Sequence, residues 1–166
     1  MSLNPEIDLE FGDGEYTFAL RMPQLIELEE KCGYRDAQNN WRKRGAVAVY
    51  GDLLSGVRFD GDQMVVELVN GVASVGDCRE IIRLGLIGGA GGRVGSAPVT
   101  MTPVLARQLC DRYVDTRPAA EWLPIAFLAL HGAMKGFEPK KAGPAVAGGS
   151  TRKRRSTRAR SSSTAG

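Results

Sequence analysis

The segment YTFALRMPQLIELEEKCG, residues Tyr16–Gly33, changes from the periodicity of a strand to that of a helix. Its first residues alternate, with apolar Tyr16, Phe18 and Leu20 on one face, as in a half-buried strand. Pro23 follows, and it suits the first turn of a helix, where a missing N–H costs nothing. Apolar residues then recur at helical spacing up to the closing glycine, which suits a helix C-cap. The segment therefore predicts a strand, a short connection and a helix.

A second alternating stretch, Glu6–Phe11, precedes this segment. Between the two lies Gly12–Glu15, whose glycines can take the positive φ that a tight turn needs. We therefore expect an antiparallel hairpin over residues 6–21. Because a two-stranded hairpin is only marginally stable alone, its apolar face must pack on the helices that follow.

Further stretches have the caps and the apolar spacing of helices. They are Gly45–Gly56, Asp77–Leu86, Thr102–Val114 and Pro118–Lys135. Asp77 is expected to be an N-cap, with Glu80 in the capping-box position. The last helix is apolar almost all round, so we expect it at the centre of the core, with a kink or a restart at Pro124.

Two segments are less regular. Within Phe59–Val75 a turn is expected at residues 60–62, and Gln63–Val69 fits either a strand or a short helix capped by Asp62. The cluster Gly88–Gly92 lacks the spacing of a phosphate-binding loop and follows a helix rather than a strand. It is therefore expected to be a flexible connection.

Charge divides the chain at residue 138. Eight of the 22 basic residues and none of the 19 acidic residues lie beyond it, so residues 1–138 hold 14 basic against 19 acidic residues, a net charge of −5. Residues 139–166 also lack the large apolar side chains that offset the entropy of ordering, which predicts disorder. We expect one globular domain at 1–138 and a disordered basic tail at 139–166. The fold class is α+β, mostly α, with an N-terminal β-hairpin packed on a small bundle of four or five helices.

The sequence shows no pattern for catalysis or for binding a metal or cofactor. Cys32, Cys78 and Cys110 are odd in number and far apart, and they are expected to be reduced, buried apolar residues. His131, in the apolar last helix, is expected to be structural, because no nucleophile or carboxylate pattern accompanies it. We therefore predict a protein that is not an enzyme and has no cofactor, metal or small-molecule substrate. A candidate contact for an anion or a partner is the basic cluster of the tail, Arg152, Lys153, Arg154, Arg155, Arg158 and Arg160.

Neither a leader nor a membrane span is predicted. The N-terminus MSLNPEIDLE is acidic and lacks the apolar centre of a signal peptide. No apolar run reaches the length needed to cross a bilayer.

The order of these elements resembles the tail protein family of gene transfer agents and related phages, whose members are described as tail assembly chaperones or tail tube proteins. The matching stretches span roughly residues 6–137 and are YTFALRMPQLIELEEKCG, RGAVAVYGDLLSG, DCREIIRLGLIGGAGG, MTPVLARQLCDRYVDTRP and LPIAFLALHG. None of them is catalytic, so the resemblance implies no functional residue. Phe59–Val75 resembles an insertion, and the basic tail is longer than the family's pattern.

Three functional hypotheses follow. The first in rank is a tail assembly chaperone, a helical module that offers an apolar groove or strand edge to a tape-measure or tail tube protein. The second is a structural tail tube component, which a single predicted hairpin disfavours because a tube needs a continuous sheet. The third is a nucleic-acid-binding protein that acts through its basic tail by neutralising phosphates, and as a partner nucleic acid is expected to make only weak, nonspecific contact with the tail. The expected location is the bacterial cytoplasm, or the virion tail if the protein is structural, with no membrane partner.

Overall fold

The hairpin predicted near the N-terminus is formed by β1 (Ile7–Phe11) and β2 (Gly14–Phe18), paired antiparallel from Ile7 opposite Phe18 to Phe11 opposite Gly14. Gly12 turns the chain with φ +64°, a conformation that glycine adopts without steric cost. The second strand ends at Phe18 rather than at residue 21. Leu20 is buried as expected, but Ala19 is buried too, so the alternation of buried and exposed residues ends with the strand.

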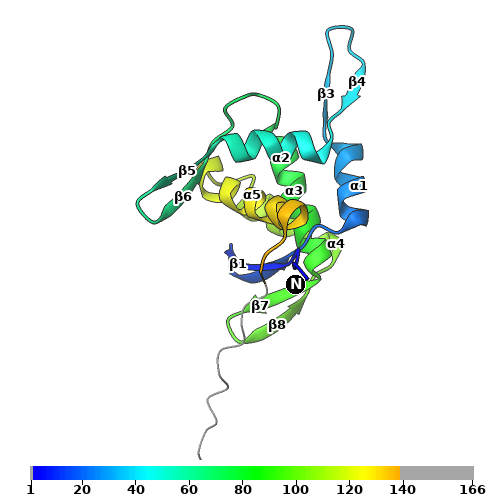
Figure 1. Ribbon diagram of the computed structural model, residues 1–166. Helices are drawn as coiled ribbons and strands as arrows, with labels where there is room; N and C mark the ends of the chain where they lie inside the picture. Colours follow the sequence, from blue (N-terminus) through cyan, green and yellow to red (C-terminus); the bar gives the residue numbers. More distant parts are fainter. Residues whose placement is uncertain (1, 139–166) are drawn as a thin grey trace, which may run out of the picture.

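The computed structural model describes residues 2–138 (Figure 1). The disorder predicted for residues 139–166 therefore lies outside the described residues. Within residues 2–138, 46% of positions are helical and 25% extended, which confirms the α+β class with more helix than strand.

The N-terminal hairpin is half of a larger sheet. Its four strands are all antiparallel, in the order β1-β2-β7-β8, where β7 is Gly91–Val94 and β8 is Ala97–Thr100. The expectation of a flexible connection at Gly88–Gly92 is thus wrong, because the helix before it continues to Gly89 and β7 begins at Gly91. Strand propensity did not reveal β7, since glycine has no side chain to pack.

The described chain contains five helices, within the range expected. They are α1 (Met22–Lys31), α2 (Ala46–Ser55), α3 (Val75–Gly89), α4 (Pro103–Tyr113) and α5 (Ala119–Lys135). Thr102 caps α4 as predicted, with its Oγ1 accepting a hydrogen bond of 3.1 Å from the Leu105 N–H. Helix α5 runs unbroken through Pro124, so the predicted restart is wrong.

The start of α3 differs from the prediction. Ser74, not Asp77, is the N-cap: its Oγ accepts from the Asp77 N–H at 3.1 Å, and the Asp77 carboxylate accepts from the Ser74 N–H at 2.8 Å. This reciprocal pair is a capping box with Asp77 in its third position. Glu80, expected in that position, instead accepts hydrogen bonds from Arg83.

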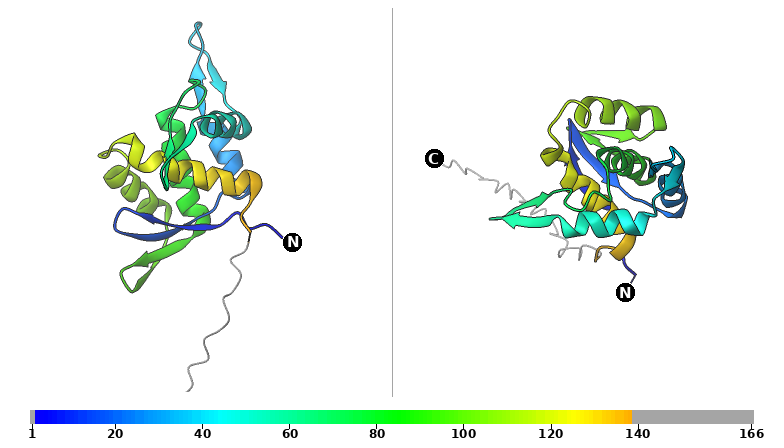
Figure 2. Two further views of the ribbon diagram at one scale, coloured as in Figure 1. Left: turned by 60° about the vertical axis from the view of Figure 1, so that its left-hand side comes forward. Right: turned by 90° about the horizontal axis from the view of Figure 1, so that it is seen from above.

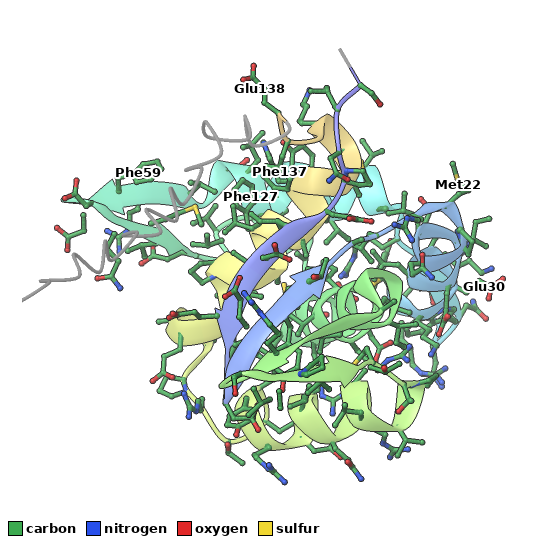
Figure 3. All side chains as sticks on the ribbon, turned by 90° about the horizontal axis from the view of Figure 1, so that it is seen from below. Met22, Glu30, Phe59, Phe127, Phe137 and Glu138 are labelled. Carbon is green, nitrogen blue, oxygen red and sulfur yellow. The ribbon has the colours of Figure 1, made fainter. Side chains whose placement is uncertain are left out.

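Two further hairpins project from the body of the molecule (Figures 1 and 2). One pairs β3 (Gly33–Arg35) with β4 (Trp41–Lys43), in a segment for which the sequence predicted no element. The other pairs β5 (Val57–Asp60) with β6 (Gln63–Val66) around the predicted turn. The strand alternative for residues 63–66 is therefore right, and the helix capped by Asp62 is wrong. Figure 3 shows Phe59 far out on this second hairpin.

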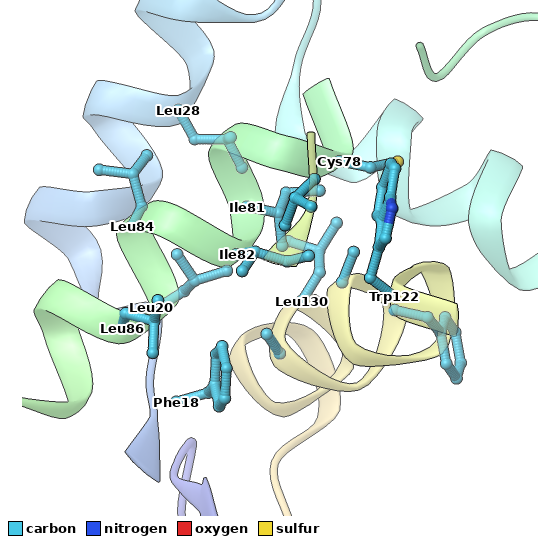
Figure 4. Packing of buried hydrophobic residues seen from close by; sticks show 14 of the residues in the cluster. Phe18, Leu20, Leu28, Cys78, Ile81, Ile82, Leu84, Leu86, Trp122 and Leu130 are labelled. Atoms are coloured by element: carbon cyan, nitrogen blue, oxygen red, sulfur yellow. The ribbon is translucent and has the colours of Figure 1, made fainter. Parts of the chain in front are cut away.

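The core is organised around α3, which contacts α1, α4, α5 and β2 (Figure 4). Its inward side chains Ile81, Ile82, Leu84 and Leu86 are fully buried. Helix α5 shares this core through Phe127 and Leu130 and also contacts α2. A 2.9 Å hydrogen bond from the Ala19 N–H to the Gly85 carbonyl joins α3 to the chain that follows β2.

Candidate functional site

The described residues hold no group of three or more His, Cys, Asp or Glu side chains that could bind a metal ion. All three cysteines are free and buried, and burial raises the pKa of Cys78 and of Cys110 to about 12. These thiols are therefore protonated near neutral pH and are poor nucleophiles. His131 lies against Phe127 and Phe137, and its Nδ1 is 3.0 Å from the Tyr50 hydroxyl. This hydrogen bond provides the structural role expected for His131.

The basic cluster predicted to contact an anion or a partner lies outside the described residues. It comprises Arg152, Lys153, Arg154, Arg155, Arg158 and Arg160. That prediction is therefore not tested, and residues 2–138 offer three further candidate contact surfaces.

The first candidate surface is the hairpin β3–β4 with its base, residues 33–44, here called the basic hairpin. The register places Arg35 opposite Trp41, and Lys43 follows Trp41 on the same face. The indole is 48% exposed, and it lies so close to Gly33 that a Cβ there would be 2.6 Å from Trp41 Cζ2. One face of the hairpin thus presents an aromatic ring flanked by two cations.

The base of the basic hairpin is fixed to the body. Arg44 Nη1 lies 2.5 Å from Asp77 Oδ2, and the Arg44 guanidinium lies 5.2 Å from the centre of the Tyr34 ring. Because Asp77 also belongs to the capping box of α3, this ion pair joins the hairpin to the N-terminus of the central helix. The hairpin is therefore held at a defined place on the fold.

The second candidate surface is the hairpin β5–β6. Phe59 is 70% exposed, and the hairpin leaves the body at Gly56, where a Cβ would clash with the Glu67 carbonyl at 1.7 Å. The loop that follows is held by Asp52, whose buried carboxylate accepts hydrogen bonds from the N–H groups of Asn70 and Ala73. Phe59 is thus an exposed aromatic residue on an anchored projection, and aromatic residues are enriched at protein–protein interfaces.

The third candidate surface is the side of the four-stranded sheet turned away from the helices, here called the outer sheet face. Its exposed or half-exposed positions are Asp8, Glu10, Glu15, Thr17, Gly91, Arg93, Pro98 and Thr100. Glu10 lies directly opposite Glu15 in the ladder, and Arg93 Nη2 is 3.7 Å from Glu15 Oε2. Five acidic residues and no basic residue occur between Glu6 and Phe18, so the β1–β2 side of this face is acidic.

The sequence contains a turn signal for the basic hairpin. Asn39 takes φ +64° in the connection between β3 and β4, and Asn is the residue other than glycine that tolerates this conformation best. The pair Asn39-Asn40 between Tyr34 and Trp41 is therefore a turn signal between two aromatic-bearing strands.

None of the helices within residues 2–138 is long and apolar enough to cross a membrane.

Comparison with protein-family models matches residues 4–136 to the family described as "Phage tail tube protein, GTA-gp10". The comparisons found no matching curated protein and no matching solved structure. The family match covers both projecting hairpins and all four strands of the sheet.

Proposed function

The chain belongs to the phage tail tube protein family, and from that premise we propose that it is a structural subunit of the tail tube of a phage or gene transfer agent. Its function in this proposal is noncatalytic, and its partners are other tail proteins. In the assembled particle it is located in the virion tail.

The observation that carries this proposal is the pair of anchored hairpins that project from the fold. They expose large aromatic side chains, with Tyr34 and Trp41 about half exposed and Phe59 more so. Exposed aromatic residues are favoured at protein–protein interfaces, where they bury a large area at low entropic cost. Projections of this kind suit contacts between neighbouring subunits of a repeating assembly.

The open edges of the sheet provide a second route to assembly. Strands β1 and β8 lie at the two ends of the strand order, so each has one side of its backbone without a partner strand in the sheet. An open edge can pair with a strand from another chain, and the sheet can thereby continue from subunit to subunit. Pro98 in β8 limits such pairing on that side, because proline donates no backbone hydrogen bond.

A tail assembly chaperone is the second candidate, and a specific observation favours it. The sheet has only four strands of four or five residues each, which is little sheet for a tube wall. Helix α1 exposes Met22 and Ile26 at helical spacing, with 67% and 54% of their surfaces accessible. An apolar helical stripe of this kind could hold an unassembled tail protein.

Quantitative mass spectrometry of purified particles distinguishes the two candidates. A tube subunit remains in the finished tail in many copies, so its amount relative to the major capsid protein should be constant through repeated purification. A chaperone is released, so its amount should fall to background while it stays abundant in the lysate. Loss of the chain from purified tails would refute the proposed structural role.

A further inference from the structure

Two of the four cations of the basic hairpin, Arg35 and Lys43, have no carboxylate partner within residues 2–138, although Arg35 Nη1 donates a 3.0 Å hydrogen bond to the Asn39 carbonyl. Both residues flank Trp41. Arg42 pairs with Asp36 inside the hairpin, and Arg44 pairs with Asp77 at its base. The Trp41 face therefore presents two positive charges beside an exposed ring, which suits a surface that combines carboxylates with a flat area.

The outer sheet face has the complementary properties. Glu10 and Glu15 are cross-strand neighbours on one face, an arrangement of like charges that destabilises an isolated sheet. Gly91, two residues from Arg93 on the same face, has no side chain and leaves a shallow hollow bordered by Asp8, Glu15, Thr17 and Arg93. A ring placed over this hollow lies beside Glu15, and Glu10 lies opposite Glu15 on the neighbouring strand.

The two surfaces lie at opposite ends of the molecule. The basic hairpin projects from one end, and the four-stranded sheet lies at the other, in both the view of Figure 1 and the view turned by 60° in Figure 2. They cannot meet within one molecule. Contact between unlike surfaces of two copies is head-to-tail, and such contacts build rings or filaments rather than closed twofold dimers.

We propose that the basic hairpin of one copy docks onto the outer sheet face of the next copy, with Trp41 over the hollow at Gly91 and with Arg35 and Lys43 paired to Glu10 and Glu15. This inference rests on the proposed function, since it describes how successive tube subunits contact each other. A second copy is favoured over nucleic acid because the chain itself carries both halves of the contact. The partner also relieves the repulsion between Glu10 and Glu15.

Paired charge reversals test this contact in the full chain. One variant carries Arg35→Glu and Lys43→Glu, and the other carries Glu10→Lys and Glu15→Lys. Wild-type protein should form extended assemblies at low salt in sedimentation and negative-stain electron microscopy. Each variant alone should need about tenfold or more protein to assemble, because like charges then face each other. Mixing the two variants should restore assembly, because each acidic hairpin then meets a basic sheet face and each basic hairpin meets an acidic one.

Matched single reversals provide the controls. Arg107→Glu on α4 and Glu30→Lys on α1 change exposed charges outside both surfaces, so both should assemble like the wild type. Circular dichroism checks that every variant is folded. Added salt should weaken wild-type assembly, because it screens the pairing of exposed charges.

Three results would overturn the proposed contact. The first is assembly of either double variant at the wild-type concentration, and the second is a mixture that assembles no better than its parts. The third is a wild-type chain that stays monomeric up to about 1 mM at low salt. If instead the hairpin variant alone loses binding to duplex DNA and mixing restores nothing, the hairpin is a nucleic-acid contact. If one of these results is obtained and the chain is nevertheless abundant in purified tails, the proposed contact is refuted but the proposed function stands.

Discussion

At the scale of single residues, glycines decide where backbones can meet. A Cβ on Gly89 would lie 1.8 Å from the Thr17 carbonyl oxygen, and one on Gly88 would lie 2.0 Å from that of Ala19. The end of α3 therefore lies directly against the chain at the end of β2. The sequence shows these glycines as a cluster, but it cannot show that the partner is a backbone distant in sequence, because that contact exists only after folding.

A matched pair of substitutions tests this close approach. Gly89→Ala should destabilise the fold by about 1–3 kcal/mol, because the added methyl meets backbone that cannot move aside. Gly51→Ala, at an exposed site in α2 with no atom within 4 Å of the added Cβ, should stabilise it by about 0.5–1 kcal/mol through helix propensity. Urea unfolding measures both free energies, and equal effects of the two substitutions would contradict the packing described.

A second pair of substitutions separates core from surface. Phe127 is 5% exposed and stacks on Tyr50 with ring centres 6.2 Å apart, so Phe127→Ala should cost about 3–5 kcal/mol. Phe59→Ala on the projecting hairpin should change the free energy of unfolding by less than about 0.5 kcal/mol. If thermal unfolding of the Phe127 variant matched that of the wild type, the place of α5 in the core would be wrong.

At the scale of elements, ion pairs tie α3 to the chain around α4. Arg79 Nε lies 2.7 Å from Asp115 Oδ1, and Arg79 Nη2 lies 2.5 Å from Asp111 Oδ1. The hydrogen bond from Arg79 lowers the pKa of Asp115 below its ordinary 3.8. The pKa of Asp115 is lower in the folded state than in the unfolded state. The ion pair therefore stabilises the fold fully above the unfolded-state pKa, and this stabilisation is lost as the pH falls through the folded-state pKa.

Removing Arg79 should therefore have a pH-dependent effect. Arg79→Ala should lower the free energy of unfolding by about 1 kcal/mol near neutral pH, a modest cost because both carboxylates are about half exposed. The difference from wild type should shrink as the pH falls below 3.8 and through the lowered folded-state pKa of Asp115. Arg107→Ala, an exposed site on α4, serves as the control without pH dependence. A difference that stays constant across this range would argue against the ion pair.

The elements that the sequence predicted well are those in which local pattern and tertiary packing agree. Period-two alternation located the β1–β2 hairpin, and Thr102 with Pro103 located the start of α4. The strands that were missed are β3, β4, β5, β7 and β8. They contain polar residues, glycine or proline, and they are stabilised by pairing with neighbouring strands rather than by a marked strand propensity of their own. The candidate surfaces were missed for the same reason, since they arise from the pairing of these strands.

At the scale of the whole molecule, basic and acidic side chains are concentrated at opposite ends of the fold. Residues 1–138 are acidic overall, yet the basic hairpin holds four basic residues and one acidic residue. The acidic side of the outer sheet face lies at the opposite end of the fold from this hairpin (Figure 2). Because the two ends of the molecule carry opposite charge, head-to-tail association of copies is favoured over a symmetric dimer.

The basic residues beyond 138 allow a separate prediction. If they bind nucleic acid, six charges should give a log–log salt slope of roughly −5 on duplex DNA, and a chain ending at Glu138 should lose this binding. In our account the truncated chain still associates with tail proteins, because recognition resides in residues 2–138. A gel shift at two salt concentrations, beside a pull-down of tail proteins, compares the two chains. A truncated chain that captures no tail protein would refute this assignment.

The central claim is that this chain forms part of the tail tube itself. Cryo-electron microscopy of purified tails, with helical reconstruction, tests it most directly. The account predicts a repeating subunit into which the fold of residues 2–138 fits, with each basic hairpin against the outer sheet face of a neighbouring copy. A tube wall built entirely from a different chain, with no density for this fold, would contradict the account.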